Sequence, residues 1–349
     1  MEKKPAAFIN SDQAQSIKGS NTYIDVDMRL IFIFFLLSGL KVFPQLADST
    51  TSTPKTENYF SFRYDNDFFS ATDRYYTQGI QVNLIHPVVR YSPFSYALIR
   101  LSRQALNYYG LQLQQDVFTP VSIRHEGIFY GERPFTAVFF VSHSLVSIHT
   151  AKKTRLETQL DLGIMGPNAK GEEEQKGIHK ALDNIEPLGW ENQLAQDIVV
   201  NYRASLEKGL IMKNNFELMG AGVGRVGTLY TDLGVCLNAR LGIFSPYFNN
   251  LGLENDPAKR KNKFKIYGFA KAGARAVVYN ATLQGGLINQ SSVYTLPASD
   301  VTRLVAECLG GIVIAYKRVS LEYSKAYITP EFKNGVDHGW GKCVITVCF

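Results

Sequence analysis

The sequence has few charged residues, few cysteines and only one long apolar run. Charged residues make up 19% of its 349 residues, whereas 45% are hydrophobic and 12% aromatic, so the composition excludes a disordered chain and a coiled coil. The formal net charge of +6 comes from 37 basic and 31 acidic residues spread along the chain, which argues against a nucleic-acid partner. The four cysteines lack CxxC spacing and nearby histidines, which argues against a zinc site.

The one long apolar run lies near the N-terminus, from Leu30 to Leu40. It follows Arg29 and precedes a polar stretch that begins at Asp48, which is the layout of a secretory signal peptide. A permanent membrane anchor is the alternative, but this run falls short of the roughly 20 residues that a spanning helix needs. We therefore expect residues 1–47 to be a signal peptide with an N-terminal extension, starting at Met1 or Met28, and residues 48–57 to be a short polar linker.

From residue 58 onward the sequence alternates with a period of two, which predicts β-strands. One face of each segment is apolar and the other carries Arg, Glu, Asp or amide side chains, as in residues 155–164, 198–207 and 232–241. Segments of ten to fifteen residues suit tilted transmembrane strands, which need roughly 9–11 residues, and exceed the usual soluble strand of about 5–6. The pattern favours a membrane β-barrel with a polar lumen over a soluble β-sandwich, the alternative.

We expect about twelve antiparallel strands in one barrel domain over residues 58–349. The predicted strands are 58–68, 77–87, 108–118, 134–148, 153–165, 196–209, 213–226, 231–244, 262–278, 301–315, 317–327 and 342–349. With both termini in the periplasm, every connection from an odd to an even strand lies outside the cell. The chain ends in a strand closed by Phe349, which resembles the assembly signal that bacterial outer-membrane barrels present to their assembly machinery.

Three polar stretches fall on these outer connections and hence on one rim. The first runs from Asp65 to Gly79, the second from Gln115 to Pro134 and the third from Gly163 to Gln193. Within the third, residues 171–183 have the composition of a short helix, on which Gln175 and His179 share a face. The histidine could act as a general base, or it could simply be a solvated loop residue.

Taken together, the motifs in these stretches resemble the lipid A 3′-O-deacylase family of outer-membrane proteins. The motifs are Asn66-Asp67-x-Phe, Asp73-Arg74-Tyr75-Tyr76-Thr77-x-Gly79, Gln115-Asp116-Val117-Phe118-Thr119-Pro120, Gly131-Glu132-Arg133-Pro134-Phe135, Gly163-x-x-Gly166-Pro167, Gln175-x-x-x-His179 and Gly189-Trp190-x-x-Gln193. They occur in the family's order and cover most of residues 58–349.

The resemblance implies a twelve-stranded barrel that depends on calcium and has its active site between the outer rim of the wall and a loop helix. It assigns catalytic roles to Asn66, Asp67, Thr77, Gln175 and His179, with Asp67 as a calcium ligand. The family's functional basic residue in the second outer loop corresponds to Arg124 or His125, which the alignment does not separate.

The expected function is hydrolysis of an ester-linked acyl or acyloxyacyl chain of lipid A at the outer surface of the outer membrane. His179 would activate water, calcium would polarise the ester carbonyl, and no GxSxG serine motif is present. Two alternatives remain open from the sequence. The chain could be a phospholipase that cleaves glycerophospholipids of the membrane, or a barrel that only forms a channel or scaffold.

Overall fold

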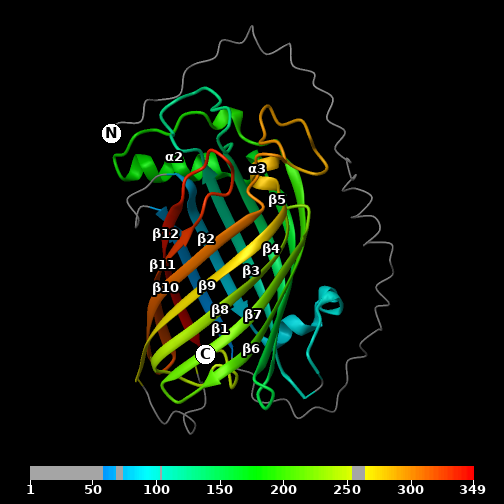
Figure 1. Ribbon diagram of the computed structural model, residues 1–349, viewed down its shortest axis with the longest axis vertical. Helices are drawn as coiled ribbons and strands as arrows, with labels where there is room; N and C mark the ends of the chain where they lie inside the picture. Colours follow the sequence, from blue (N-terminus) through cyan, green and yellow to red (C-terminus); the bar gives the residue numbers. More distant parts are fainter. Residues whose placement is uncertain (1–57, 68–73, 103, 254–263) are drawn as a thin grey trace. The chain divides into compact units, whose positions relative to one another are not determined.

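The computed structural model describes residues 58–67, 74–102, 104–253 and 264–349. The predicted signal peptide and linker, residues 1–57, lie outside the described residues. Twelve strands form a closed antiparallel barrel in which β1 pairs with both β2 and β12 (Figure 1). The strands are β1 (Tyr59–Asn66), β2 (Tyr75–Ile85), β3 (Leu106–Thr119), β4 (Thr136–His149), β5 (Thr154–Met165), β6 (Asp197–Met212), β7 (Phe216–Gly227), β8 (Tyr230–Ile243), β9 (Phe264–Asn280), β10 (Leu304–Tyr316), β11 (Val319–Ile328) and β12 (His338–Cys348).

The number of strands and their places along the chain match the prediction, with shifts of a few residues at the ends. The period-two alternation decides which side chains face inward. In β5 and β6, Gln159, Asp161 and Arg203 line the lumen, whereas leucines such as Leu160 and Leu206 face outward. Among the described residues, no helix is long and apolar enough to cross a membrane.

The connections that carry α2 and α3 gather at one end of the barrel, and the β2–β3 connection, which carries η3 and η4, lies at the other (Figure 1). The helix α2 (Gly171–Ala181) lies in the β5–β6 connection, as predicted, preceded by the 3-10 turn η5 (Pro167–Ala169) and followed by η6 (Trp190–Asn192). The sequence did not indicate α3 (Ala281–Gln284) or the 3-10 helices η3 (Pro87–Tyr91) and η4 (Pro93–Ala97). These short elements have no apolar period of their own to predict them.

Loops plug the barrel at both ends. At the outer end, Leu283, Leu296 and Phe332 of the loops after β9 and β11 pack in one apolar cluster with Val277 of β9 and Val305 of β10. At the inner end, Phe248 is fully buried beside Met219 and Ile148. The polar lumen predicted from the alternation is therefore present, but the described loops cover both of its ends.

Candidate functional site

The candidate residues of β1 and β2 lie at the outer ends of these two strands. Asn66 pairs with Gln78 across the two strands, and the same row continues to Val117 of β3 and Ala137 of β4. Because residues directly opposite one another share a face, Asn66 and Gln78 point away from the lumen, on the opposite face of the wall from Asp65. This row of the outer wall is the platform on which α2 lies.

Thr77 occupies a β-bulge between Tyr76 and Gln78, where the register of β2 against β3 shifts by one residue. Its hydroxyl oxygen lies 2.7 Å from that of Thr119, and both side chains are buried. A bulge re-aims the side chain that it displaces, and bulges are common beside active sites. Thr77, to which the resemblance assigns a catalytic role, therefore directly precedes Gln78, a residue of the platform beneath α2.

Asp67 follows the end of β1 and is also buried. The backbone N–H of Arg74 donates a hydrogen bond of 2.8 Å to its Oδ2. The Asn66 side-chain amide donates to the Tyr64 hydroxyl at 3.1 Å, and this phenol interacts electrostatically with the carboxylates of both Asp67 and Glu174. Tyr64 thus lies between the end of β1 and α2, although the sequence had not indicated a role for it.

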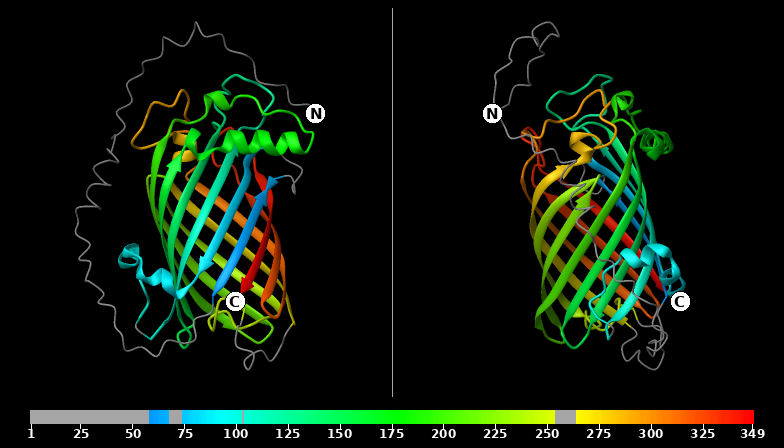
Figure 2. Two further views of the ribbon diagram at one scale, coloured as in Figure 1. Left: turned by 180° about the vertical axis from the view of Figure 1, so that it is seen from behind. Right: turned by 90° about the vertical axis from the view of Figure 1, so that its right-hand side faces the viewer.

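The helix α2 crosses the outer ends of the strands on the outside of the wall (Figure 2). Its first residue, Gly171, sits so close to the wall that a Cβ there would lie 2.5 Å from the Ala137 Cβ and 2.9 Å from the Trp190 ring. Three residues later, the Gln78 amide donates a hydrogen bond to Glu174 Oε1. Close approach at one point and a side-chain hydrogen bond at another hold the helix against the barrel.

The face of α2 that meets the wall carries the two residues predicted to share it. Gln175 and His179 are 3% and 7% exposed, whereas Glu173 and Lys180 of the same helix face solvent. Residues four apart lie one turn apart on a helix, so the two side chains are neighbours. The solvated-loop alternative for His179 is therefore wrong, because its side chain is buried.

His179 has a fixed proton position. Its Nδ1 lies 2.6 Å from the backbone carbonyl oxygen of Ile185, and because a carbonyl can only accept, the neutral imidazole carries its proton on Nδ1. The turn after α2 brings Ile185 to the imidazole, because the Asn184 N–H donates a hydrogen bond of 2.8 Å to the His179 backbone carbonyl. The lone pair is then on Nε2, which is the nitrogen that can take a proton.

Gln175 is oriented by Trp190, a buried residue whose importance the sequence reasoning did not recognise. The indole Nε1–H donates to Gln175 Oε1 at 2.8 Å, so the amide turns its Nε2 the other way. That nitrogen is buried and has no hydrogen-bond partner among the described residues. Trp190 itself packs against Phe135, with ring centroids 4.9 Å apart. The only signal for this contact was the Gly-Trp motif itself.

Glu174 is a third residue, after Tyr64 and Trp190, whose role the sequence did not indicate. Burial raises its pKa to about 7, and its second oxygen, Oε2, is buried without a hydrogen-bond partner in the described part of the chain. A carboxylate oxygen left unpaired in a buried position is costly unless a proton or a cation accompanies it. The carboxyl group is therefore suited either to hold a proton or to bind a cation.

The candidate calcium ligands are oxygen atoms, as this hard cation requires. Asp67 and Glu174 both supply carboxylate oxygens, and Oε2 of Glu174 is the unpaired one. Both carboxylates interact electrostatically with the Tyr64 hydroxyl group, so they lie on the same side of the wall. Within the described ranges, no group of three or more His, Cys, Asp or Glu side chains could hold a metal ion. Calcium commonly completes its shell with backbone carbonyls and water, so the residues present fit this ion without such a cluster.

Arg124 and His125 lie in the loop between β3 and β4, and both side chains are exposed. The His125 ring packs edge-on against Phe129, with centroids 5.4 Å apart, and its backbone carbonyl lies beside Gly189. The structure places both residues on the same rim as α2, next to the segment that follows it. Their contact with a substrate stays a prediction.

The same loop carries Arg133, which is fully buried and has a structural role. Its guanidinium donates to Thr282 Oγ1 at 2.9 Å, lies 3.4 Å from Glu331 and stacks over the Phe118 ring. These contacts join the second outer loop to α3 and to the β11–β12 loop. Arg133 of the Gly-Glu-Arg-Pro motif thus connects the outer loops to one another and does not line the space beneath α2.

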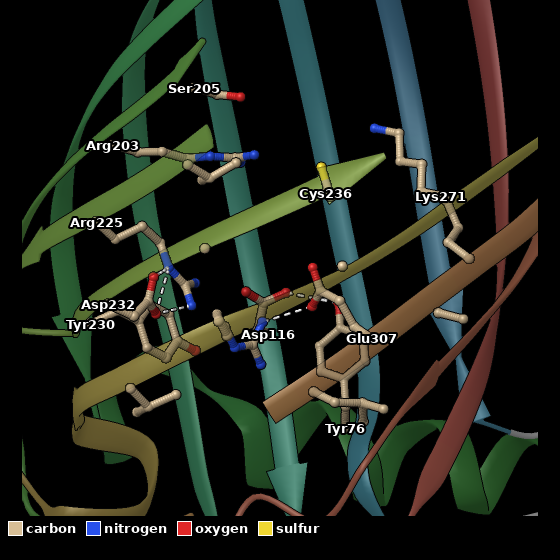
Figure 3. Close-up of a pocket in the computed structure, with 18 of the residues that line it drawn as sticks. Tyr76, Asp116, Arg203, Ser205, Arg225, Tyr230, Asp232, Cys236, Lys271 and Glu307 are labelled. Atoms are coloured by element: carbon tan, nitrogen blue, oxygen red, sulfur yellow. Dashed lines mark hydrogen bonds and ion pairs between the residues drawn. The ribbon is translucent and has the colours of Figure 1, made fainter. Parts of the chain in front are cut away.

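The lumen holds a separate cavity of about 490 Å³ on the inner face of the wall (Figure 3). Its lining includes ion-paired residues such as Arg225 with Asp232, together with Asp116, Lys271 and Glu307. Since Asn66 and Gln78 point to the outer face, this cavity is not the space between α2 and the wall.

Comparisons with known proteins identify a family and a solved structure with the same barrel fold. The model of one protein family, described as outer membrane protein LpxR, matches residues 30–349. Among solved structures, LpxR from Salmonella typhimurium superposes with a TM-score of 0.68 at 22% identity, over 83% of this chain and all of that one. The β-domain of the Bordetella autotransporter BrkA, at 10% identity over 83% of this chain and 97% of its own, reaches a TM-score of 0.40. No curated protein sequence matches the chain.

Proposed function

The chain belongs to the LpxR family of outer membrane proteins, and from this premise we propose that it is a calcium-dependent lipid A deacylase. It hydrolyses an ester-linked acyl or acyloxyacyl chain of lipid A at the outer surface of the membrane. The observation that carries the proposal is the buried His179, whose Nδ1 is held by the Ile185 carbonyl on the membrane-facing side of the barrel wall. A base at this place meets a lipid substrate at the level of the outer leaflet.

His179 acts as the general base. With its proton on Nδ1, Nε2 removes a proton from water, and the resulting hydroxide attacks the ester carbonyl carbon. The tetrahedral intermediate then collapses with cleavage of the carbon–oxygen bond, and Nε2–H returns the proton to the sugar oxygen. The products are a free fatty acid and a sugar hydroxyl group, and no serine nucleophile takes part.

Gln175 supplies a hydrogen-bond donor to the reacting group. Because Trp190 occupies Oε1, the buried Nε2–H₂ is left to donate to the carbonyl oxygen as negative charge develops there. A fixed donor in a site that excludes water stabilises an oxyanion more than a water molecule does, since it does not have to reorient. Asn66 and Thr77 hold the ends of β1 and β2 beside it.

Asp67 and Glu174 are the residues that would hold calcium. When bound, calcium would supply positive charge that polarises the ester carbonyl. The raised pKa of Glu174 is consistent with this role, because a bound cation would compensate the ionised carboxylate that burial disfavours. Arg124 and His125, exposed on the neighbouring loop, are the residues that we propose contact the phosphates or sugars of lipid A.

The test is mass spectrometry of lipid A from cells that express the chain or its His179→Ala variant, with calcium supplied. Barrel assembly is checked in both by the difference in migration between boiled and unboiled samples on a denaturing gel. We expect one acyl or acyloxyacyl unit to be lost with the unmutated chain only, since a general base contributes about 10²–10⁴-fold. Intact lipid A with free fatty acid released from glycerophospholipid would replace the proposal by a phospholipase, and no hydrolysis at all would leave a non-enzymatic barrel.

A further inference from the structure

The β2–β3 connection folds onto the outside of the barrel instead of crossing its inner rim. Residues 87–100, here called the wall segment, contain η3 and η4 and stand against the lower half of the wall in each view (Figures 1 and 2). Nothing in the proposed hydrolysis uses this segment, because it lies at the opposite end of the strands from α2. Its surroundings indicate a separate role.

The wall segment covers a polar strip on the membrane-facing side of the barrel. His143, Ser147 and Thr158 occupy outward positions of β4 and β5, in series with apolar residues such as Val141 and Leu160, yet they are at most 5% exposed. Polar side chains on a lipid-facing wall are destabilising unless a partner covers them. The wall segment is that partner.

Four hydrogen bonds join the wall segment and the residue that follows it to this strip and to β6. The Ser95 hydroxyl lies 2.8 Å from His143 Nε2, and the Leu101 N–H donates to Ser147 Oγ at 3.1 Å. The carbonyl oxygens of Ile99 and Ala97 accept from Thr158 at 3.2 Å and from Tyr202 at 3.0 Å. The segment is thus fixed to the wall by specific contacts along its length.

The depth of these contacts places the wall segment within the membrane. His143 lies six residues from His149, the inner end of β4. At about 3.3 Å per residue and a tilt of roughly 40°, the contacts run from about 5 Å above the inner rim at Ser147 to about 15 Å at His143, and so span the inner part of an apolar band about 25 Å tall. The segment therefore reaches the hydrocarbon of the inner, periplasmic leaflet.

The backbone of the wall segment is paired as that depth requires. Successive 3-10 turns close from Val89 to His86, from Ser92 to Val89 and from Ser95 to Ser92, at 3.0–3.1 Å. Side chains cap both helices, since His86 Nδ1 accepts from Val88 N–H and Ser92 Oγ accepts from Phe94 N–H. Pro87 and Pro93 start the two helices and have no N–H to satisfy. Irregular backbone is tolerated at membrane depth only where its polar groups find partners in the protein.

The side chains that point away from the wall are apolar or aromatic, and two arginines accompany them. Exposed fractions of 48–69% are found for Val88, Tyr91, Phe94, Tyr96 and Ile99. Arg90 and Arg100 both act electrostatically on Tyr109, close to the inner end of β3, and neither has an ion-pair partner among the described residues. Tyrosines and arginines at the edge of an apolar surface are typical of the boundary between hydrocarbon and headgroups.

We propose that the wall segment is a re-entrant element that binds glycerophospholipids of the periplasmic leaflet. Its apolar side chains contact the acyl chains, and the two arginines bind headgroup phosphates by charge-assisted hydrogen bonds. The partner is the lipid bilayer and not a second protein, because the exposed apolar surface continues that of the neighbouring wall, where Val141 and Leu206 are also exposed.

The experiment is fluorescence quenching of a Phe94→Trp variant of the full chain, folded into phosphatidylcholine vesicles with or without brominated acyl chains. The emission added by this tryptophan is obtained by subtracting that of the unmutated chain. We expect bromine to remove most of the added emission and aqueous iodide to leave it unchanged. The matched control is Tyr130→Trp, on an outer loop at a residue that is 83% exposed, whose emission should respond to iodide and not to bromine.

Two results would overturn the proposal. If iodide quenches Phe94→Trp as it quenches the control, the segment lies in water. If neither agent quenches it, a protein surface, such as a second copy of the chain, covers it. A Val88→Trp variant serves the same test should Phe94→Trp fail to assemble, and because no hydrolysis is measured, the result is independent of the proposed enzymatic function.

Discussion

At the scale of single residues, the proposed site depends on two side chains, His179 and Gln175, that are held by groups outside the set proposed to be catalytic. Ile185 contributes only its backbone carbonyl, and this fixes which nitrogen of His179 carries the proton. Trp190 contributes one N–H, and this fixes which end of the Gln175 amide is left to act as a donor in the proposed reaction. Such supporting contacts determine whether a catalytic side chain is correctly oriented before the substrate arrives.

Replacing Trp190 with Phe should therefore lower kcat more than it raises KM. The variant loses the hydrogen bond that orients Gln175, which is worth about 1 kcal/mol, or roughly fivefold in rate if the amide then samples both orientations. The measurement is steady-state hydrolysis by folded protein in detergent. Trp340→Phe is the matched control, since this tryptophan lies in β12 and packs edge-to-face against Tyr76. Equal losses in the two variants would contradict an orienting role for Trp190.

The pKa of Glu174 predicts a dependence of α2 docking on pH in the absence of calcium. Burial raises this pKa to about 7, whereas a glutamate in an unfolded chain titrates near about 4.3. The folded protein binds more protons between these two values, so docking is strongest below about pH 4.3 and weakens as the pH rises through 7.

We expect trypsin to cleave after Lys176 and Lys180 faster at pH 8 than at pH 6.5. The ratio of these two cleavage rates should be larger for the unmutated chain than for the Glu174→Gln variant. This variant keeps the shape of the side chain, an oxygen that can accept from Gln78 and no titrating group, so it corrects for the pH dependence of trypsin itself. The same ratio of rates for both proteins would show that the Glu174 carboxyl group does not control docking.

At the scale of elements, the position of α2 on the wall depends on a small residue at its start. Gly171 lies against Ala137 of β4 and against Trp190, both buried, and leaves no room for a methyl group. Because interiors are closely packed, an added methyl group must move either the helix or the wall. The barrel wall is tied by continuous strand pairing, so the helix is the element that moves.

Gly171→Ala should consequently lower hydrolysis and expose α2 to protease, while the barrel stays assembled. Gly177→Ala in the same helix is the matched control, since a Cβ there has nothing within 4 Å and alanine favours a helix by about 1 kcal/mol. Activity and trypsin cleavage are measured for both variants, with assembly checked by gel migration. Full activity of Gly171→Ala would mean that close approach of α2 is not required.

At the scale of the whole molecule, the two faces of the wall have separate tasks. The inner face carries ion pairs and a polar cavity, and the outer face carries α2 near one end and the wall segment near the other. Burial of Arg133 between Thr282 and Glu331 ties the outer loops into one plug. In the part of the chain that the structure describes, buried loop residues thus lie at both ends of the lumen.

The plugs predict that the protein does not conduct ions. Reconstituted into planar bilayers in concentrated salt, the folded chain should give no open-channel steps, whereas an open porin of similar strand number provides the positive control. The reason is physical occlusion by Phe332 and Leu296 at one end and by Phe248 at the other. Regular conductance steps would show that the plugs leave the lumen, and would support the channel alternative.

The sequence by itself determined the number of strands, their inward and outward faces, and the helical face that carries Gln175 and His179. These features depend on periods of 2 and 3.6, which are local and therefore visible along the chain. The resemblance then selected Asn66, Asp67 and Thr77, and the strand register confirmed that they share one end of the barrel with α2.

Only the tertiary structure decided which groups orient the site and where the β2–β3 connection goes. The contacts of Trp190 with Gln175, of Glu174 with Gln78 and of Ser95 with His143 join residues 15, 96 and 48 positions apart. No local period encodes such pairs, because they depend on the register of the strands and on the side from which a loop returns to the wall. Polar residues such as His143 and Thr158 appear in the sequence as breaks in an apolar face, and the folded chain shows that the wall segment covers them.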